Sequence, residues 1–328
     1  MGAQFSSTIT QMFPPKPGFT EEHIPSLDGK VYIVTGSNTG VGKETARILY
    51  SKNAKVYIAA RSQERAEKAI DEISKAFPNS KGGLVFLKLD LSDLTTIKAS
   101  ADEFLLREKK LDVLFNNAGV QNPLPEPSKT AQGYEYHIGV NGIGTYAFTK
   151  FLTPILASTA KTEGTSRVIW VSSSGTELMG LKSVGIDMNN LDFHENKPYL
   201  VRYGFSKVCN WLHGVEFAKR YKADGIISIP LNPGNLSSDL YRNQSGFMNI
   251  VTALLTYPSI NGAYTLLYAG LSPDITIEKT GSWVVPWGRI RPIRKDLMDA
   301  TKTEEEGGNG TAKKFWEWTD EQVNKHTK

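Results

Sequence analysis

Two residues four positions apart, Tyr203 and Lys207, have the types and spacing of a proton-transfer pair. A free tyrosine titrates near 10, so proton transfer near pH 7 requires a shift of about 3 units, or roughly 4 kcal/mol. Neighbours at i and i+4 of a helix approach closely, and a cation about 4 Å away contributes about this much at an effective dielectric near 20. The charge of Lys207 could therefore supply the required pKa shift of Tyr203. A packed tyrosine ring beside a lysine whose amine reaches solvent would have the same spacing.

The same spacing occurs a second time, at Tyr146 and Lys150, so the pattern alone does not identify a site. Apolar residues after Tyr203 recur at helical intervals, which predicts a helix with one buried face. Which of the two pairs belongs to a functional site must be judged from the position of each pair along the chain.

A glycine-rich segment at residues 35–42 lies between a short apolar run and a helical pattern. Backbone amides and the helix N-terminus at such a strand-to-helix junction can hold a pyrophosphate, and glycines let the phosphates approach the backbone. A purely structural turn is the alternative. We predict a dinucleotide site here, contacted by Gly36, Ser37, Asn38, Gly40, Val41 and Gly42.

Arg61 follows the second predicted strand, about 20 residues after this loop, where NAD enzymes usually carry a carboxylate. A guanidinium suits a 2'-phosphate both in charge and in donor geometry. The sequence therefore predicts NADP(H) as the cofactor, and the alternative is an arginine that merely faces solvent. Arg65 could assist Arg61 or be a surface charge on a helix.

Two further polar positions end predicted strands. Residues 116–119, Asn-Asn-Ala-Gly, close the fourth strand at the carboxyl edge, where ligands bind in open parallel sheets. Asp90 ends the third strand and could accept a hydrogen bond from the adenine amine or cap the following turn. We expect Asp90, Asn117, Ala118 and Gly119 to contact the cofactor, with simple turn chemistry as the alternative.

With these residues in order, the sequence resembles a classical short-chain dehydrogenase/reductase and is similar to the retinol-dehydrogenase-like subgroup. The resemblance covers roughly residues 28–290. It implies that Asn141, Ser173, Tyr203 and Lys207 are catalytic. Tyr203 would exchange a proton with the substrate oxygen, Lys207 would lower the pKa of Tyr203 and bind the nicotinamide ribose, Ser173 would hydrogen-bond the substrate oxygen, and Asn141 would hold a water.

Family order favours Tyr203 over Tyr146, because Tyr203 follows the strand that ends in Ser172-Ser173-Ser174 and Tyr146 precedes it. Ser172 and Ser174 remain alternatives to Ser173. The resemblance also places Pro233, Gly234, Leu236 and Ser238 beside the cofactor. Ser238 stands where the family usually has threonine, and it keeps a hydroxyl.

Twenty-nine residues separate Ser173 from Tyr203, about twice the usual family interval or more. Apolar residues of this insertion are expected to form one wall of the substrate site, and residues 241–257 the other. The expected substrate is thus a hydrophobic alcohol or carbonyl compound, unless these side chains pack only against each other. The residues of the first wall are Leu178, Met179, Leu181, Ile186, Met188, Leu191 and Phe193.

Apolar runs rich in β-branched residues alternate with helical patterns, which predicts a single α/β domain of the Rossmann type. Its sheet should be parallel and doubly wound, with helices on both faces and a C-terminal substrate-loop region. We expect a leader at residues 1–26, the domain at 27–290, and a tail at 291–328 with a short amphipathic helix. The strands are expected at 31–34, 56–60, 84–89, 113–115, 168–171, 226–229 and 282–286, and the helices at 65–77, 94–107, 144–156 and 260–271.

Composition narrows the function further. The chain has 328 residues, 40% of them apolar, a net charge of +4 and no basic run, so no nucleic-acid partner is expected. Its single cysteine, Cys209, excludes an internal disulfide, disfavours a metal site and suits the cytoplasm.

The N-terminus fits the pattern for myristoylation at Gly2, and a disordered tail is the alternative. One acyl chain would give only weak, peripheral membrane association. By resemblance the chain could form a homodimer or homotetramer. A second class of function, a dinucleotide-binding scaffold or redox sensor without turnover, is disfavoured because the four catalytic positions are all present.

Overall fold

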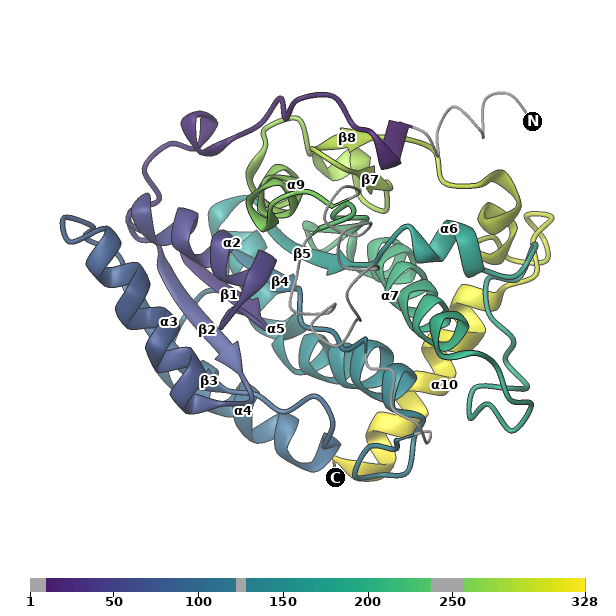
Figure 1. Ribbon diagram of the computed structural model, residues 1–328. Coiled ribbons are helices and arrows are strands. Elements are labelled where there is room, and N and C mark those ends of the chain that lie inside the picture. Colours follow the sequence, from purple (N-terminus) through teal and green to yellow (C-terminus); the bar gives the residue numbers. More distant parts are fainter. Residues whose placement is uncertain (1–9, 122–127, 237–255, 328) are drawn as a thin grey trace, which may run out of the picture.

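The computed structural model describes residues 10–121, 128–236 and 256–327. Its strands form one sheet in the order β3-β2-β1-β4-β5-β6-β7-β8, in which every pair is parallel except β7 with β8 (Figure 1). The doubly wound parallel sheet is thereby confirmed. The strands are β1 (Val31–Thr35), β2 (Lys55–Ala60), β3 (Gly83–Lys88), β4 (Val113–Asn116), β5 (Ser166–Val171), β6 (Ile226–Leu231), β7 (Val284–Val285) and β8 (Arg289–Ile290).

Helices cover both faces of this sheet (Figure 1). Successive side chains of a strand point to opposite faces, and in β1 Val31 and Ile33 join one hydrophobic cluster while Tyr32 and Val34 join another. The first cluster contains residues of α4 (Leu94–Arg107), α5 (Thr145–Glu163) and α7 (Tyr199–Tyr221). The second contains residues of α2 (Gly40–Ser51), α3 (Gln63–Ala76) and α9 (Ser259–Leu271).

The remaining helical elements of the described residues are short, except α10 (Thr311–His326), which has 16 residues. The short ones are η1 (Glu21–His23), η2 (Ile138–Gly144), α6 (Gly175–Met179), η4 (Ile277–Lys279) and η5 (Lys295–Ala300). The sequence predicts one helix from residue 144, whereas α5 is preceded by the π-helical turn η2, which carries Asn141. It also predicts a last strand at 282–286, but β7 has two residues and turns back into β8 through Gly288, whose φ is +79°.

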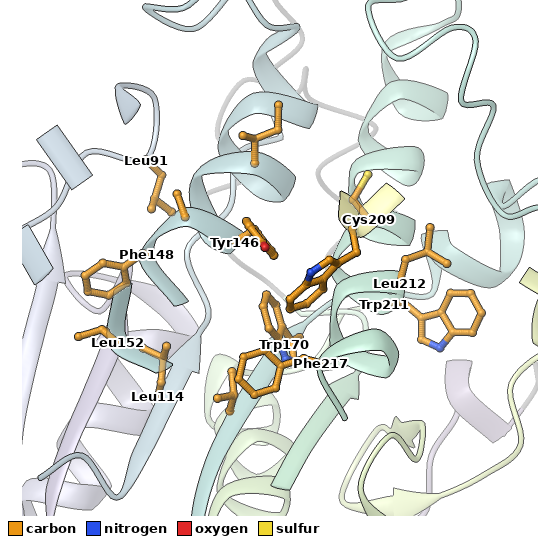
Figure 2. Close-up of a cluster of buried hydrophobic side chains, with 14 of the residues drawn as sticks. Leu91, Leu114, Tyr146, Phe148, Leu152, Trp170, Cys209, Trp211, Leu212 and Phe217 are labelled. Carbon is orange, nitrogen blue, oxygen red and sulfur yellow. The ribbon is translucent and has the colours of Figure 1, made fainter. Parts of the chain in front are cut away.

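The predicted amphipathic helix of the tail is α10, and it packs into the main core. Phe315 and Val323 of α10 are fully buried in the same hydrophobic cluster as Leu212 and Phe217 of α7. Figure 2 shows Trp170 of β5 beside Phe217, with the side chains of α5 on the other side of the cluster. The Trp170 indole nitrogen donates to Ser228 Oγ at 3.0 Å, so this large residue is buried without losing its hydrogen bond.

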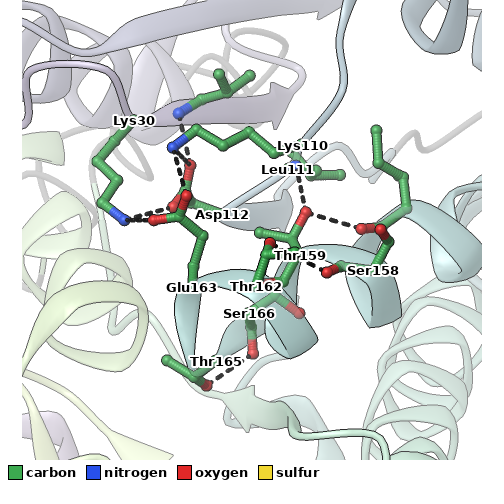
Figure 3. A network of polar contacts seen from close by, with 12 residues as sticks. Lys30, Lys110, Leu111, Asp112, Ser158, Thr159, Thr162, Glu163, Thr165 and Ser166 are labelled. Atoms are coloured by element: carbon green, nitrogen blue, oxygen red, sulfur yellow. Dashed lines mark hydrogen bonds and ion pairs between the residues drawn. The ribbon is translucent and has the colours of Figure 1, made fainter.

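A charged network ties the amino ends of β1 and β4 together (Figure 3). The carboxylate of Asp112, which is 7% exposed, accepts from the Val31 amide at 2.8 Å and pairs with Lys30 at 2.9 Å. Lys30 and Lys110 also reach Glu163 at the end of α5, at 2.8 and 3.1 Å. These contacts fix the strands at the end opposite to the one where ligands bind in such sheets.

No helix in the described part of the chain is both long enough and apolar enough to cross a bilayer.

Replacing Asp112 by alanine should lower the free energy of unfolding by about 1–3 kcal/mol, because the buried Val31 amide loses its acceptor. Urea denaturation would measure this. Asp102→Ala is the matched control: Asp102 pairs with Lys98 at 2.7 Å on an exposed face of α4, so its loss should cost about 0.5 kcal/mol or less. Equal effects of the two substitutions would contradict the structural role of Asp112.

Candidate active site

A cleft of about 520 Å³ opens at the carboxyl ends of β1, β2, β4 and β5. The sheet runs outward in opposite directions from β1 and β4, and ligands bind at such switch points. The cleft is lined by residues from segments that are distant in the sequence, including the glycine-rich loop, Arg61, Asp90, residues 117–121, Ser173, Tyr203, Lys207 and residues 233–236.

The glycine-rich loop joins β1 to α2, as predicted. Gly36 has a φ of +66°, and a Cβ added there would lie 2.9 Å from Ala118 Cα, so this turn requires glycine. Gly40, with a φ of +56°, begins α2 and has open space where a Cβ would point. The arrangement leaves the helix N-terminus accessible from the cleft, which is the geometry that binds phosphate groups.

Two of the six predicted loop residues, Ser37 and Gly42, do not line the cleft. Asn38 and Val41 line the cleft with Gly36 and Gly40. The side chain of Ser37 is buried and donates to the Val34 carbonyl at 2.6 Å. A Cβ on Gly42 would lie 2.5 Å from Asn117 Nδ2, so Gly42 packs against the neighbouring loop. Ser37 and Gly42 therefore hold the turn in shape.

Arg61 lies directly after β2 at one end of the cleft, beside Ser62 and Arg65. Its Nη1 donates to Tyr136 Oη at 3.5 Å. Asp90 also lines the cleft, and its Oδ1 accepts from the backbone amide and hydroxyl of Ser92 at 2.9 and 2.6 Å. Asp90 therefore caps the turn that follows β3. It also lines the cleft, where the adenine contact is predicted.

The turn after β4 is tied to the last residue of β1. Asn117 Nδ2 donates to the Thr35 carbonyl at 2.8 Å, and the Ala118 amide donates to Thr35 Oγ1 at 2.9 Å. Asn141 is fully buried and reaches the same turn: its Oδ1 accepts from the Val120 amide at 2.7 Å. Asn141 Nδ2 donates to Ser206 Oγ at 2.8 Å, so η2 is linked to α7 one residue before Lys207.

Tyr203 and Lys207 lie one turn apart near the start of α7, and both line the cleft. Lys207 is 4% exposed, and its Nζ donates to the Val171 carbonyl at the end of β5 at 3.0 Å. The same Nζ lies 5.8 Å from the centre of the Tyr203 ring. A Cβ on Gly119 would come within 2.9 Å of Nζ, so the turn after β4 leaves just enough room for the ammonium group.

Of the three serines after β5, Ser172 and Ser173 differ in what their hydroxyls contact. Ser172 is 1% exposed and its Oγ donates to the Lys207 carbonyl at 2.6 Å, with Thr176 Oγ1 also at 2.6 Å. Ser173 is half-buried at the cleft, and its Oγ accepts from the Gly175 amide at 3.1 Å. The Ser172 hydroxyl is therefore occupied by the protein, which disfavours Ser172 as the substrate contact, whereas Ser174 lines the cleft together with Ser173.

The second tyrosine-lysine pair lies elsewhere. Tyr146 donates to Asp320 Oδ1 at 2.7 Å, and Lys150 pairs with the same carboxylate at 2.6 Å, so the pair anchors α10 to α5. Burial, together with this hydrogen bond to Asp320, raises the pKa of Tyr146. A phenol held in its neutral form in this way is unsuited to acid-base chemistry near pH 7.

The expected substrate walls are only partly present. Leu178 and Met179 of α6 line the cleft, whereas Ile186 and Phe193 are buried in the core, and Met188 and Leu191 pack against it. Leu181 is partly exposed outside the cleft lining. The interpretation of the whole insertion as a wall is wrong, because most of its apolar side chains serve to pack the segment onto the domain. Ser238 and most of the second wall, residues 241–255, lie outside the described residues.

Pro233, Gly234 and Leu236 line the cleft after β6. The sequence interpretation missed Val120, Gln121, Tyr136 and Leu200, which line it as well. Leu200 precedes Tyr203 by three residues on α7, so helical spacing could have identified it. Within the described ranges no cluster of three or more histidine, cysteine or acidic side chains could hold a metal ion.

Comparisons with known proteins give consistent results. A family model described as short chain dehydrogenase matches residues 30–184. A short-chain dehydrogenase/reductase of Neocamarosporium betae, bet4, is 51% identical over 97% of this chain and 93% of its own length. A short-chain dehydrogenase/reductase of Phomopsis amygdali is 52% identical over 95% of each chain.

A solved structure is also similar. The crystal structure of an uncharacterized protein from Mycobacterium paratuberculosis is 26% identical, with a TM-score of 0.65, and the match covers 92% of this chain and 98% of that one.

Lys207 gives a pH-dependent prediction. Burial lowers its pKa to about 8, so the unfolded chain binds more protons than the folded one between about pH 8 and pH 10.5, and stability should rise with pH in that window. Below about pH 8 the buried charge costs the cofactor-free protein up to about 3 kcal/mol. The stability of Lys207→Met relative to wild type, measured in urea, should therefore fall as the pH rises from 7.5 to 10.

Lys161→Met serves as the control, because Lys161 is exposed at the end of α5. Its stability relative to wild type should be the same at both pH values. A pH-independent difference for Lys207→Met would contradict the burial of a charged amine.

Proposed function

The chain belongs to the short-chain dehydrogenase/reductase family, and we propose that it is an NADP(H)-dependent member that interconverts a hydrophobic alcohol and its aldehyde or ketone. Family membership makes it an oxidoreductase; the cofactor and the substrate class are the proposal. The observation that carries it is that Tyr203 and Lys207 line the same cleft as the glycine-rich loop and Arg61.

The residues around the cleft fit a dinucleotide. The turn at Gly36 and the N-terminus of α2 would hold the pyrophosphate, since no side chain of the described residues occupies the space beside Gly40. Arg61 and Arg65 would bind the 2'-phosphate of NADP, and no carboxylate lies in residues 59–62, where an NAD enzyme would place one. Asp90, Asn117, Ala118 and Gly119 would line the adenosine and ribose side, and Pro233, Gly234 and Leu236 the nicotinamide side.

A bound nicotinamide supplies or accepts the hydride at the carbon of the substrate. The chain itself handles the proton: in reduction the Tyr203 hydroxyl donates its proton to the carbonyl oxygen, and in oxidation the phenolate takes it back. The nearby Lys207 ammonium favours the phenolate electrostatically. Ser173 would hold the substrate oxygen beside Tyr203, and Asn141 would support a water between Lys207 and solvent.

The apolar side of the cleft supports a hydrophobic substrate. Leu178, Met179 and Leu200 line it close to Ser173 and Tyr203. Apolar walls with a few polar groups are the usual composition of a small-molecule site. A panel of lipophilic aldehydes, ketones and alcohols, followed by NADPH absorbance, would identify both the class and the preferred direction.

Three further predictions accompany this function. A cytoplasmic location is consistent with one buried, unpaired cysteine, Cys209. Weak membrane association through a myristoylated Gly2 concerns a residue outside the described ranges, and mass spectrometry of the native N-terminus would test it. A homodimer or homotetramer is the family expectation, to be tested by the mass of the protein in solution.

Replacing Tyr203 by phenylalanine should reduce turnover by about 100-fold or more, because the proton donor is lost while the ring and its packing remain. NADPH affinity, followed by fluorescence, should change little. Tyr146→Phe is the matched control and should keep wild-type turnover, since its hydroxyl is bonded to Asp320 away from the cleft. Full activity of Tyr203→Phe would refute the assignment.

Replacing Arg61 by alanine should weaken NADPH about 10-fold or more and leave NADH nearly unaffected, because a charge-assisted contact to the 2'-phosphate is removed. Dissociation constants for the two cofactors would measure the ratio. Arg107→Ala, on an exposed salt bridge to Glu103 in α4, is a control for the loss of one positive charge. An unchanged NADPH-to-NADH ratio in Arg61→Ala would mean that the phosphate is recognised elsewhere.

A further inference from the structure

The segment before the family match contacts two elements that border the cleft, and it does so through one side chain, Gln11. Gln11 lies well before residue 30, where the family match begins, yet it is only 7% exposed. Its amide reaches two elements that are distant in the sequence, α6 and the turn after β6. Arg289 of β8 fixes the same segment by donating to the Thr10 carbonyl at 2.7 Å.

The first contact is to α6. Gln11 Nε2 donates to Glu177 Oε2 at 2.7 Å. The other oxygen of Glu177 accepts from the Arg294 amide at 3.1 Å, so both carboxylate oxygens are in use. Leu178 and Met179, the next two residues of α6, line the cleft. Gln11 therefore holds the helix that supplies the apolar substrate wall.

The second contact is to Asn232, which is 2% exposed. Asn232 Nδ2 donates to Gln11 Oε1 at 2.9 Å, and Asn232 Oδ1 accepts from the Gly234 amide at 3.0 Å. Gly234 has a φ of +103°, and a Cβ there would lie 2.8 Å from the Trp287 ring, so this turn has little freedom to shift. Gln11 thus reaches the Pro233-Gly234 turn through a single intervening side chain.

We propose that Gln11 is a positioning residue that sets α6 and the Pro233-Gly234 turn on either side of the nicotinamide and substrate end of the cleft. The proposal rests on the proposed function. A primary amide is suited to this position, because it donates to a carboxylate and accepts from a second amide at once. Because Asn232 is buried and Glu177 is partly buried, loss of either hydrogen bond removes the partner of a polar group that is shielded from water.

The position of Gln11 predicts a selective effect on the two halves of the cofactor. The adenosine half, bound near Arg61, should be insensitive to Gln11, and the nicotinamide half should depend on it. Adenosine 2',5'-bisphosphate carries only the first half, so it is the reference ligand. In Gln11→Met, the dissociation constant of NADPH should rise about 5- to 30-fold, the effect of one or two hydrogen bonds, while that of the bisphosphate stays within about twofold.

Met12→Ala is the matched control, because Met12 is the next residue and is 41% exposed. It should leave both dissociation constants unchanged. If wild type binds neither ligand, the proposed function fails and the positioning role fails with it. If wild type binds both ligands, two results would overturn the positioning role alone. Either Gln11→Met has the same two dissociation constants as wild type, or it raises both by the same factor.

A charge-swapped pair tests the contact even if Gln11→Met is poorly folded. Gln11→Glu places a carboxylate against Glu177 and should weaken NADPH relative to the bisphosphate. In the double variant Gln11→Glu with Glu177→Gln, the amide nitrogen at position 177 can donate to the carboxylate at position 11. The amide oxygen at position 177 can still accept from the Arg294 backbone amide. NADPH affinity and the KM of the carbonyl substrate should return to within about twofold of wild type. Absence of this rescue would overturn the proposal.

Discussion

The site depends on a lysine that is held out of water. Burying an ammonium group is costly unless a hydrogen-bonding partner is provided, and here the partner is the Val171 carbonyl at the end of β5. The requirement links several features: β5 must end at Val171, Gly119 must lack a side chain, and α7 must pass the end of β5 so that Lys207 reaches the Val171 carbonyl. The stability lost to this buried charge is the physical basis of its proposed role, because a poorly solvated cation acts strongly on a neighbouring phenol.

Two identical spacings of tyrosine and lysine have opposite environments in this protein. Tyr203 faces the cleft with a cation nearby, whereas the hydroxyl of Tyr146 is bonded to the carboxylate of Asp320. A carboxylate acceptor and burial both favour the neutral phenol, and a cation favours the phenolate. The same local pattern therefore anchors a C-terminal helix in one place and lines the candidate active site in the other. The surroundings of each pair distinguish them, and these depend on the fold.

Much of the fold could be predicted from the sequence, because buried parallel strands and amphipathic helices have strong local patterns. The helix at 94–107 and the loop between β1 and α2 are examples. Contacts between distant residues could not be predicted in the same way. Apolar periodicity identifies Ile186 and Phe193 as candidates for burial but does not say whether they face a ligand or the core. The contacts of Gln11 join residues separated by 166 and 221 positions, which no local pattern encodes.

The central claim is that this cleft brings a nicotinamide and a carbonyl compound together beside Tyr203. The most direct measurement uses NADPH carrying deuterium at both positions of nicotinamide C4, a lipophilic aldehyde and mass spectrometry of the alcohol formed. The proposed function predicts one deuterium on the former carbonyl carbon and a new hydroxyl proton from the protein and solvent. Alcohol formed without deuterium, or no alcohol from any carbonyl compound despite tight NADPH binding, would contradict it.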